Sequence, residues 1–129
     1  MHPETCRADT APVVVAPDGS AVGILCGVTR GGMAVFTLPG WAVSRAVAHR
    51  TVEEVWYVVS GSGRMWRRLG DWDSVTDLAP GTSLSLPSGT RFQFRSDSGE
   101  PLVAVGVTMP PWPGEGEAVP VEGIWPPTV

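Results

Sequence analysis

Short apolar segments separated by turn-forming residues recur along most of the chain. Several alternate apolar with polar positions, as in SLSL and RFQFR, and many are rich in valine and aromatic residues. This pattern is typical of β-strands, because successive side chains of a strand point to opposite faces. We expect strands at residues 21–28, 33–38, 43–49, 53–59, 64–68, 74–78, 83–86, 90–95 and 102–109.

The breaks between these segments carry turn residues such as Pro39-Gly40, Gly61-Ser62-Gly63 and Pro80-Gly81. Proline presets a backbone angle that turns need, and glycine supplies positive φ angles. Sixteen glycines and thirteen prolines also disfavour long helices. Eight or nine short strands in roughly ninety residues predict an all-β sandwich or barrel.

A chain of 129 residues is long enough for one well-buried core and too short for two ordinary domains. Residues 1–20 are polar and should form a loose arm or add one edge strand. Residues 21–109 should form the barrel. Residues 110–129 are rich in proline and should run extended over the surface, with Trp112 and Trp125 docked in grooves.

Charge narrows the range of partners. The net charge is −4, with nine arginines and no lysine, so a nucleic-acid partner is not expected. The lack of lysine excludes Schiff-base chemistry and pyridoxal phosphate attachment. No apolar run approaches the length of a membrane helix and no secretory signal is visible, so we expect no membrane partner and a cytoplasmic location.

Two cysteines and a group of three arginines could form binding sites, but each has a simpler interpretation. Cys6 and Cys26 fit neither a disulfide-rich scaffold nor a zinc pair, and we interpret both as reduced thiols. Arg64, Arg67 and Arg68 suggest an anion-binding patch. An exposed strand face paired with acidic side chains is the favoured interpretation of these arginines.

Gly81, Pro87 and Gly89, followed by Phe92 and Ser96, have a distinctive spacing. This spacing resembles the second motif of the cupin superfamily, with Phe92 where the family has histidine and Ser96 where it has asparagine. Together with the first motif, the resemblance covers about residues 33–114. It implies a double-stranded β-helix barrel of the jelly-roll type, often dimeric, with its site in the barrel mouth.

The first cupin motif is matched by His49, Glu54 and Gly61, with Val47 in place of its first histidine. Metal-dependent cupins hold their ion with three histidines and one glutamate, of which this chain keeps His49 and Glu54. A tightly held transition metal normally has at least three protein ligands. We therefore expect no metal and no other cofactor; the alternative is a weak divalent ion at this pair.

Strand alternation predicts which side chains share the barrel mouth with His49 and Glu54. The candidates for substrate contact are Arg45 and Val47 before His49, Trp56 after Glu54, and Phe92 and Phe94 in the second motif. The expected result is an apolar, aromatic chamber with few polar groups, which is the usual composition of a small-molecule site.

A carboxylate beside an imidazole favours the imidazolium, and such a pair can exchange a proton near neutral pH. The favoured function is therefore a metal-independent enzyme for a small, partly apolar metabolite, with His49 and Glu54 catalysing isomerisation, cyclisation or dehydration. Secondary metabolism is the expected context. A non-catalytic binding module and a metalloenzyme with a reduced site remain alternatives, as does a purely structural pair. We expect a homodimer.

Overall fold

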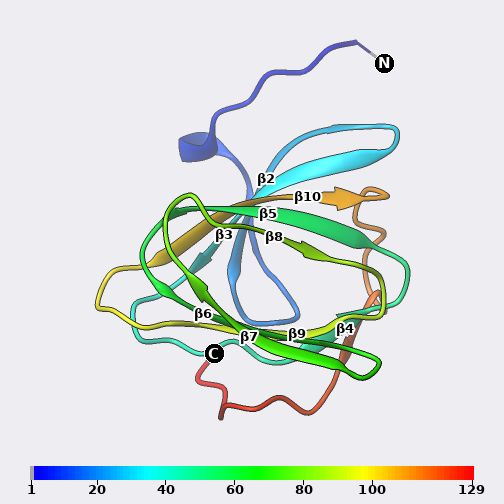
Figure 1. Ribbon diagram of the computed structural model, residues 1–129. Coiled ribbons are helices and arrows are strands. Elements are labelled where there is room, and N and C mark those ends of the chain that lie inside the picture. Colours follow the sequence, from blue (N-terminus) through cyan, green and yellow to red (C-terminus); the bar gives the residue numbers. More distant parts are fainter. Residues whose placement is uncertain (1) are drawn as a thin grey trace.

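Residues 2–129 are described by a computed structural model, in which two antiparallel β-sheets enclose one core (Figure 1). The strands are β1 (Val13–Val15), β2 (Ala21–Val28), β3 (Gly31–Leu38), β4 (Val47–His49), β5 (Glu53–Ser60), β6 (Gly63–Leu69), β7 (Trp72–Leu78), β8 (Ser83–Leu86), β9 (Arg91–Ser96), β10 (Leu102–Met109) and β11 (Ala118–Pro120). One turn of 3-10 helix, η1 (Ala8–Thr10), precedes them. No helix within residues 2–129 has the length and apolar character needed to cross a bilayer.

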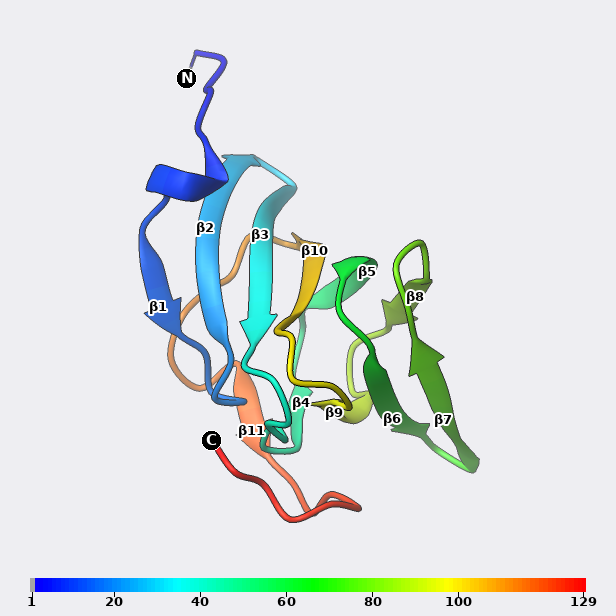
Figure 2. The same cartoon turned by 90° about the vertical axis from the view of Figure 1, so that its left-hand side faces the viewer.

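The six-stranded sheet has the order β1-β2-β3-β10-β5-β8, which can be followed across Figure 2. The five-stranded sheet has the order β11-β4-β9-β6-β7. Several neighbouring strands come from distant parts of the sequence, as β3, β10 and β5 do. This is the double-stranded β-helix expected from the sequence, and the jelly-roll prediction is confirmed.

Eight of the nine predicted strands are present with ends that differ by at most two residues, and the segment 43–49 is the exception. Only Val47–His49 is strand there. The backbone before it bonds outside a regular ladder: the Ser44 N–H donates to the Phe94 carbonyl at 2.9 Å, and the Arg45 N–H donates to the Asp18 carbonyl at 2.8 Å. An irregular path breaks the alternation assumed for this segment.

The core is centred on aromatic side chains that face each other across the two sheets. Phe36 and Trp56 stack at 4.6 Å, and Phe94 meets Trp56 edge-on at 5.1 Å. Gly106 of β10 pairs with Trp56 of β5, and a Cβ at this position would overlap the Phe36 ring. A glycine on the central strand therefore makes room for the aromatic stack.

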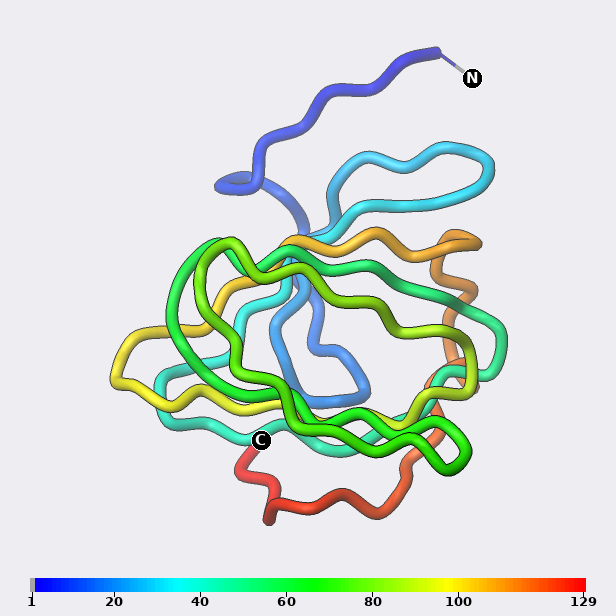
Figure 3. The backbone as a smooth tube through the Cα atoms, in the orientation of Figure 1, coloured from blue at the N-terminus to red at the C-terminus, as the bar shows by residue number. Residues whose placement is uncertain are grey.

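The tail after β10 is bound to the outside of the five-stranded sheet, along the orange-to-red path in Figure 3. The Gln93 side chain is buried and forms four hydrogen bonds, three of them to the tail. Its Nε2 donates to the carbonyls of Ser44 and Trp125, both at 2.8 Å, and its Oε1 accepts from the N–H groups of Ile124 and Trp125 at 3.0 and 3.1 Å. Trp125 also lies under the Arg64 guanidinium, 5.6 Å from the ring centre.

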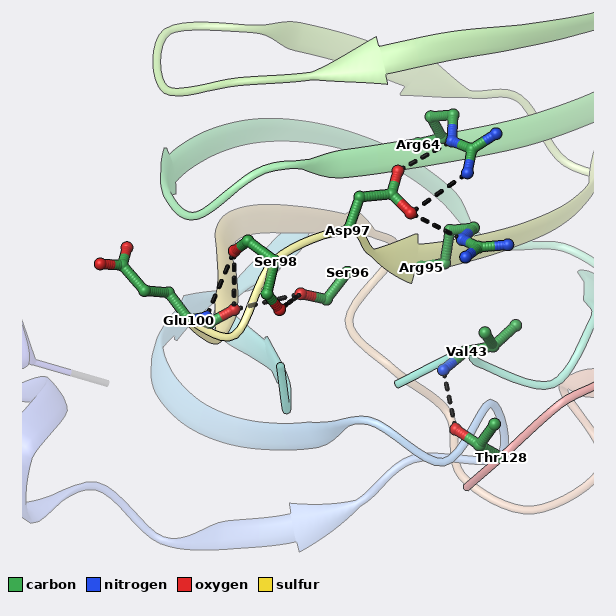
Figure 4. Close-up of polar contacts among 8 residues, drawn as sticks. All are labelled: Val43, Arg64, Arg95, Ser96, Asp97, Ser98, Glu100 and Thr128. Atoms are coloured by element: carbon green, nitrogen blue, oxygen red, sulfur yellow. Dashed lines mark hydrogen bonds and ion pairs between the residues drawn. The ribbon is translucent and has the colours of Figure 1, made fainter. Parts of the chain in front are cut away.

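A carboxylate organises the arginines nearest to the tail (Figure 4). Asp97 accepts from Arg64 Nε and from Arg95 Nε, both at 2.8 Å. The same view shows the Thr128 hydroxyl accepting from the Val43 N–H at 2.9 Å, close to the chain's C-terminus. For Arg64, the predicted pairing with an acidic residue is confirmed.

The two ends of the chain extend both sheets. In the N-terminal arm, β1 pairs with β2 as an edge strand, which was one of the two possibilities expected for residues 1–20. In the tail, β11 pairs with β4, a strand that the sequence pattern did not predict. Cys6 and Cys26 are free thiols with their Sγ atoms 3.3 Å apart, which places the arm beside β2.

Candidate functional site

His49 and Glu54 meet at the open end of the barrel. His49 is the last residue of β4, Glu54 is the second residue of β5, and a short turn between the strands brings the side chains together. His49 Nδ1 lies 3.3 Å from Glu54 Oε2, with side chains that are 8% and 3% exposed. The pair is therefore withdrawn from bulk water, although both members are ionisable.

Burial decides the protonation of this pair. Loss of solvation raises the pKa of Glu54 to about 8 and lowers the pKa of His49 to about 4. Between these values the pair has no net charge, with the proton on Glu54 and the imidazole neutral. The sequence favoured an imidazolium, whereas burial of both groups in an apolar site favours the uncharged pair.

The position of Glu54 indicates which imidazole nitrogen carries the proton. Glu54 Oε2 lies 3.3 Å from His49 Nδ1, and a protonated carboxyl at this position favours the tautomer with the imidazole proton on Nε2. Within residues 2–129, Nε2 has no hydrogen-bond partner on the protein. The rings of Phe92 and Trp112 hold the imidazole edge-on, at 5.2 and 4.9 Å. His49 is thus fixed in orientation while one N–H stays free for a ligand.

A cavity of about 430 Å³ adjoins the pair. Its walls come from β1, β2, β3, β10 and β5 of the six-stranded sheet on one side and from β4, β9 and the tail on the other. Most lining residues are apolar, and the polar side chains among them are those of Asp18, His49, Glu54 and Thr108. The volume falls within the range of small-molecule pockets, and the few polar groups suit orientation of a ligand.

The residues predicted to contact substrate divide into two groups. Val47, Trp56 and Phe92 line the cavity together with the His49–Glu54 pair. Phe94 is buried behind Trp56 and does not line it. Arg45 lies outside: it is exposed, and its Nε donates to the Val129 carbonyl at 2.9 Å. The prediction for Arg45 was wrong because the chain before Val47 is not a strand.

Among the lining residues that the sequence did not predict, three bear on the chemistry of the site. Asp18 is buried in the turn before β2, where it accepts from the Ser20 N–H and hydroxyl at 2.9 and 2.6 Å, and burial raises its pKa. Thr108 lies on β10, beside Glu54 in the sheet register. Trp112 was expected to dock the tail, and the structure adds that it docks against His49. No local pattern marks these positions, because distant segments bring them to the cavity.

Glu117 in the tail holds the turn between His49 and Glu54. Its carboxylate accepts from the N–H groups of Thr51 and Val52 at 2.7 and 2.6 Å. Burial acts to raise the pKa of Glu117, but these hydrogen bonds outweigh it and the pKa is lowered. Glu117 is thus ionised, and its negative charge acts to raise the pKa of His49 against the larger effect of burial.

Few side chains near His49 and Glu54 could act as metal ligands. No cluster of three or more His, Cys, Asp or Glu side chains with the arrangement of a metal site is found in residues 2–129. Val47 and Phe92, which pair across β4 and β9, fill the positions beside His49 with apolar atoms. A site with two protein ligands does not fit the coordination that zinc, iron or manganese requires for tight binding.

The His49–Glu54 pair can give a proton to a bound molecule and take one back. His49 Nε2–H can donate to a bound molecule while Glu54 passes its own proton to Nδ1. The pair then holds one proton fewer, as it does above the pKa of Glu54, and it regains a proton by the reverse path. A pKa near 8 places this exchange close to neutral pH, where acid–base catalysis is effective.

Comparison with known proteins agrees with this architecture. A cupin-domain family model matches residues 34–108. A search of curated proteins finds no significant match. Among solved structures, PAC13 from Streptomyces, determined with uridine, aligns with a TM-score of 0.74 and 15% identity over 97% of this chain and 95% of that one.

Two further structures show the same likeness. KdgF from Halomonas sp. aligns with a TM-score of 0.71 and 14% identity, covering 84% of this chain and 94% of that one. An uncharacterised protein with a double-stranded β-helix domain from Klebsiella pneumoniae aligns with a TM-score of 0.69 and 17% identity, covering 95% and 100%. At these identities the likeness concerns the fold alone.

Proposed function

The chain belongs to the cupin domain family, and from this premise we propose that it is a metal-independent enzyme acting on a small, partly apolar metabolite by proton transfer. The reaction class is an isomerisation, cyclisation or dehydration, each of which needs a group that gives and takes a proton. The observation that carries the proposal is the buried His49–Glu54 contact of 3.3 Å beside a cavity of about 430 Å³.

The cost of burying this pair supports a catalytic role. Two ionisable side chains removed from water destabilise a fold unless their contacts compensate. Here the compensation is the 3.3 Å contact between His49 Nδ1 and Glu54 Oε2 and a 3.5 Å contact in which Trp56 Nε1 donates to Glu54 Oε1. Groups whose pKa values are shifted this far in a ligand-sized cavity are typical of functional sites.

The roles follow from position. His49 is the group that exchanges a proton with the substrate, because its Nε2 has no protein partner. Glu54 holds and returns the second proton through Nδ1. Trp56, Phe92 and Val47 supply apolar contact, and Asp18 and Thr108 supply polar contact. The uridine in the PAC13 structure supports a ligand of comparable size for this cavity.

Replacement of the pair tests the enzyme proposal. His49→Gln and Glu54→Gln keep the approximate side-chain volume but remove the proton exchange. We expect turnover of a substrate found by screening small metabolites to fall by about 10²-fold or more, with the fold intact by circular dichroism. Phe94→Leu is the matched control, since it changes an aromatic beside Trp56 that does not line the cavity. Normal turnover by both glutamine variants would contradict the proposal.

The two alternatives predict different results. A binding module would hold a ligand tightly without turnover in either wild type or variants, and the largely apolar cavity wall is the observation that favours it. A metalloenzyme would carry near-stoichiometric metal after purification without chelator, which elemental analysis measures. We propose that the protein carries well under one transition metal per chain.

A further inference from the structure

A second cavity lies away from the His49–Glu54 pair, where β8 at the edge of one sheet faces β6 and β7 of the other. In Figure 2, β7 and β8 lie on the same side of the molecule, far from β1. The cavity has a volume of about 270 Å³ and shares no lining residue with the first. Its walls are formed by Arg67, Leu69, Trp72, Ser85, Pro87 and Thr90. We call it the seam cavity.

Arg67 is the only charged residue that lines the seam cavity. Its Nη1 donates to the Ser85 carbonyl at 3.0 Å and its Nη2 to the Thr76 hydroxyl at 3.1 Å. Unlike Arg64, it forms no ion pair with any Asp or Glu in residues 2–129. Burial lowers the pKa of the Arg67 guanidinium, as expected for a cation whose partners are neutral.

Two polar atoms at this cavity are buried without a partner. They are Arg67 Nε and Thr90 Oγ1, the only such side-chain atoms found within residues 2–129. Thr90 is 3% exposed. Buried polar atoms without a partner destabilise a fold, so such atoms normally have one. Both atoms belong to residues that line one cavity, which indicates an acceptor that the protein itself does not supply.

We propose that the seam cavity binds a small organic carboxylate, with its oxygens on Arg67 and Thr90 and its carbon body against Leu69, Trp72 and Pro87. A guanidinium has five N–H donors and only two are engaged, which leaves Nε–H and an Nη proton for a two-point contact with a carboxylate. The Thr90 hydroxyl adds a third donor.

Charge and shape favour a monoanion over phosphate. One arginine balances one negative charge, and no second cation lines the cavity to balance a phosphate dianion. Half of the lining residues are apolar, and the Trp72 ring already lies 5.2 Å from the Arg67 guanidinium. An aromatic or alkyl carboxylate satisfies both the unpaired donors and the apolar wall.

Nuclear magnetic resonance of the arginine Nε–H groups tests this assignment in the full chain. The Arg67 signal is identified by its absence in Arg67→Lys. We expect sodium benzoate to shift it saturably in the millimolar range or below, and sodium acetate to do so more weakly. Sodium phosphate, sodium chloride and benzyl alcohol at matched ionic strength should cause no saturable shift.

Two variants distinguish a specific carboxylate site from an unspecific pocket. Thr90→Val preserves shape and removes the third donor, so benzoate affinity should fall by about tenfold or more, in line with a hydrogen bond to a charged group. Arg68→Gln removes the same charge from the next position of β6, which does not line the cavity, and should leave the affinity unchanged. Both variants are first checked for folding by thermal denaturation.

Several outcomes would overturn the proposal. An equal shift with benzyl alcohol would show a merely apolar pocket, and tighter binding of phosphate would show an oxyanion site without an apolar part. No saturable shift at about 10 mM benzoate, or unchanged affinity in Thr90→Val, would show that the two donors are not aimed at a ligand.

Discussion

His49 and Glu54 have opposite effects on how stability depends on pH. The pKa of Glu54 is raised from 4.5 to about 8, so the folded chain binds the extra proton between these values and stability falls as pH rises. The pKa of His49 is lowered from 6.5 to about 4, so stability rises with pH across that interval. The two slopes cancel from about pH 4.5 to 6.5, and only the decline due to Glu54 remains above it.

This predicts a specific pH profile. From pH 6.5 to 8 the free energy of unfolding should fall by about 2 kcal/mol, and Glu54→Gln should remove that decline while keeping the rise due to His49 below pH 6.5. Chemical denaturation at a series of pH values measures both profiles. The difference between the wild-type and Glu54→Gln profiles gives the contribution of Glu54, because the raised pKa of Asp18 affects both proteins alike. Parallel profiles would contradict the assignment.

At the residue scale the sequence identified the pair but not its full surroundings. His49 and Glu54 were found because motif spacing places them at adjacent strand ends, and Trp56 and Phe92 because alternation holds within β5 and β9. Arg45 was misplaced because alternation fails where the chain leaves the sheet. Asp18 and Thr108 reach the cavity through pairing of distant segments, which no local pattern reports.

The observed strand bounds agree best with the predicted ones where turn-forming residues flank the strand. Strands β2, β8 and β10 have the predicted bounds, since glycine, proline or aspartate marks their ends. Strand β11 was not predicted because three residues between prolines and glycines carry no period of their own. It forms by pairing with β4, while Glu117 and Gln93 hold the tail on either side.

The tail is therefore expected to be part of the folded unit. A chain that ends at Met109 loses β11, the Glu117 contacts and all Gln93 partners in the tail. Its melting temperature should fall by several degrees or more, because the loss leaves buried polar groups of the barrel unpaired. Gln93→Met in the full chain should reproduce part of the loss. Equal melting of truncated and full-length protein would show that the tail is not needed for stability.

At the scale of the whole molecule, β1 is an exposed edge. It ends the six-stranded sheet, and Val13 and Val15 are 65% and 78% exposed. An apolar edge strand with unpaired backbone groups invites association. We predict a homodimer formed through this edge, with a mass by light scattering near twice 13.6 kDa. Val15→Lys should shift the mass toward one chain, and a wild-type mass near 13.6 kDa at micromolar concentration would contradict the prediction.

The arrangement of the whole molecule also explains how the first cavity forms, which the sequence composition could not show. The first cavity forms because β1, β2 and β3 extend past the barrel core and the tail closes the opposite side with Trp112. The sequence predicted β1 as part of an arm, β2 and β3 as barrel strands and the last segment as a tail, and it assigned none of them to the site. The cavity is a property of the fold around the motif residues, and the motif alone specifies only the pair.

The central claim is that His49 and Glu54 form a proton-holding pair without metal, and the titration of Glu54 tests it most directly. With ¹³C-labelled glutamate, the carboxyl signal assigned through Glu54→Gln should titrate near pH 8 in protein purified without chelator or added metal. Ionisation near pH 4.5, or a carboxylate signal that does not change from pH 5 to 9 as in a metal ligand, would contradict the account.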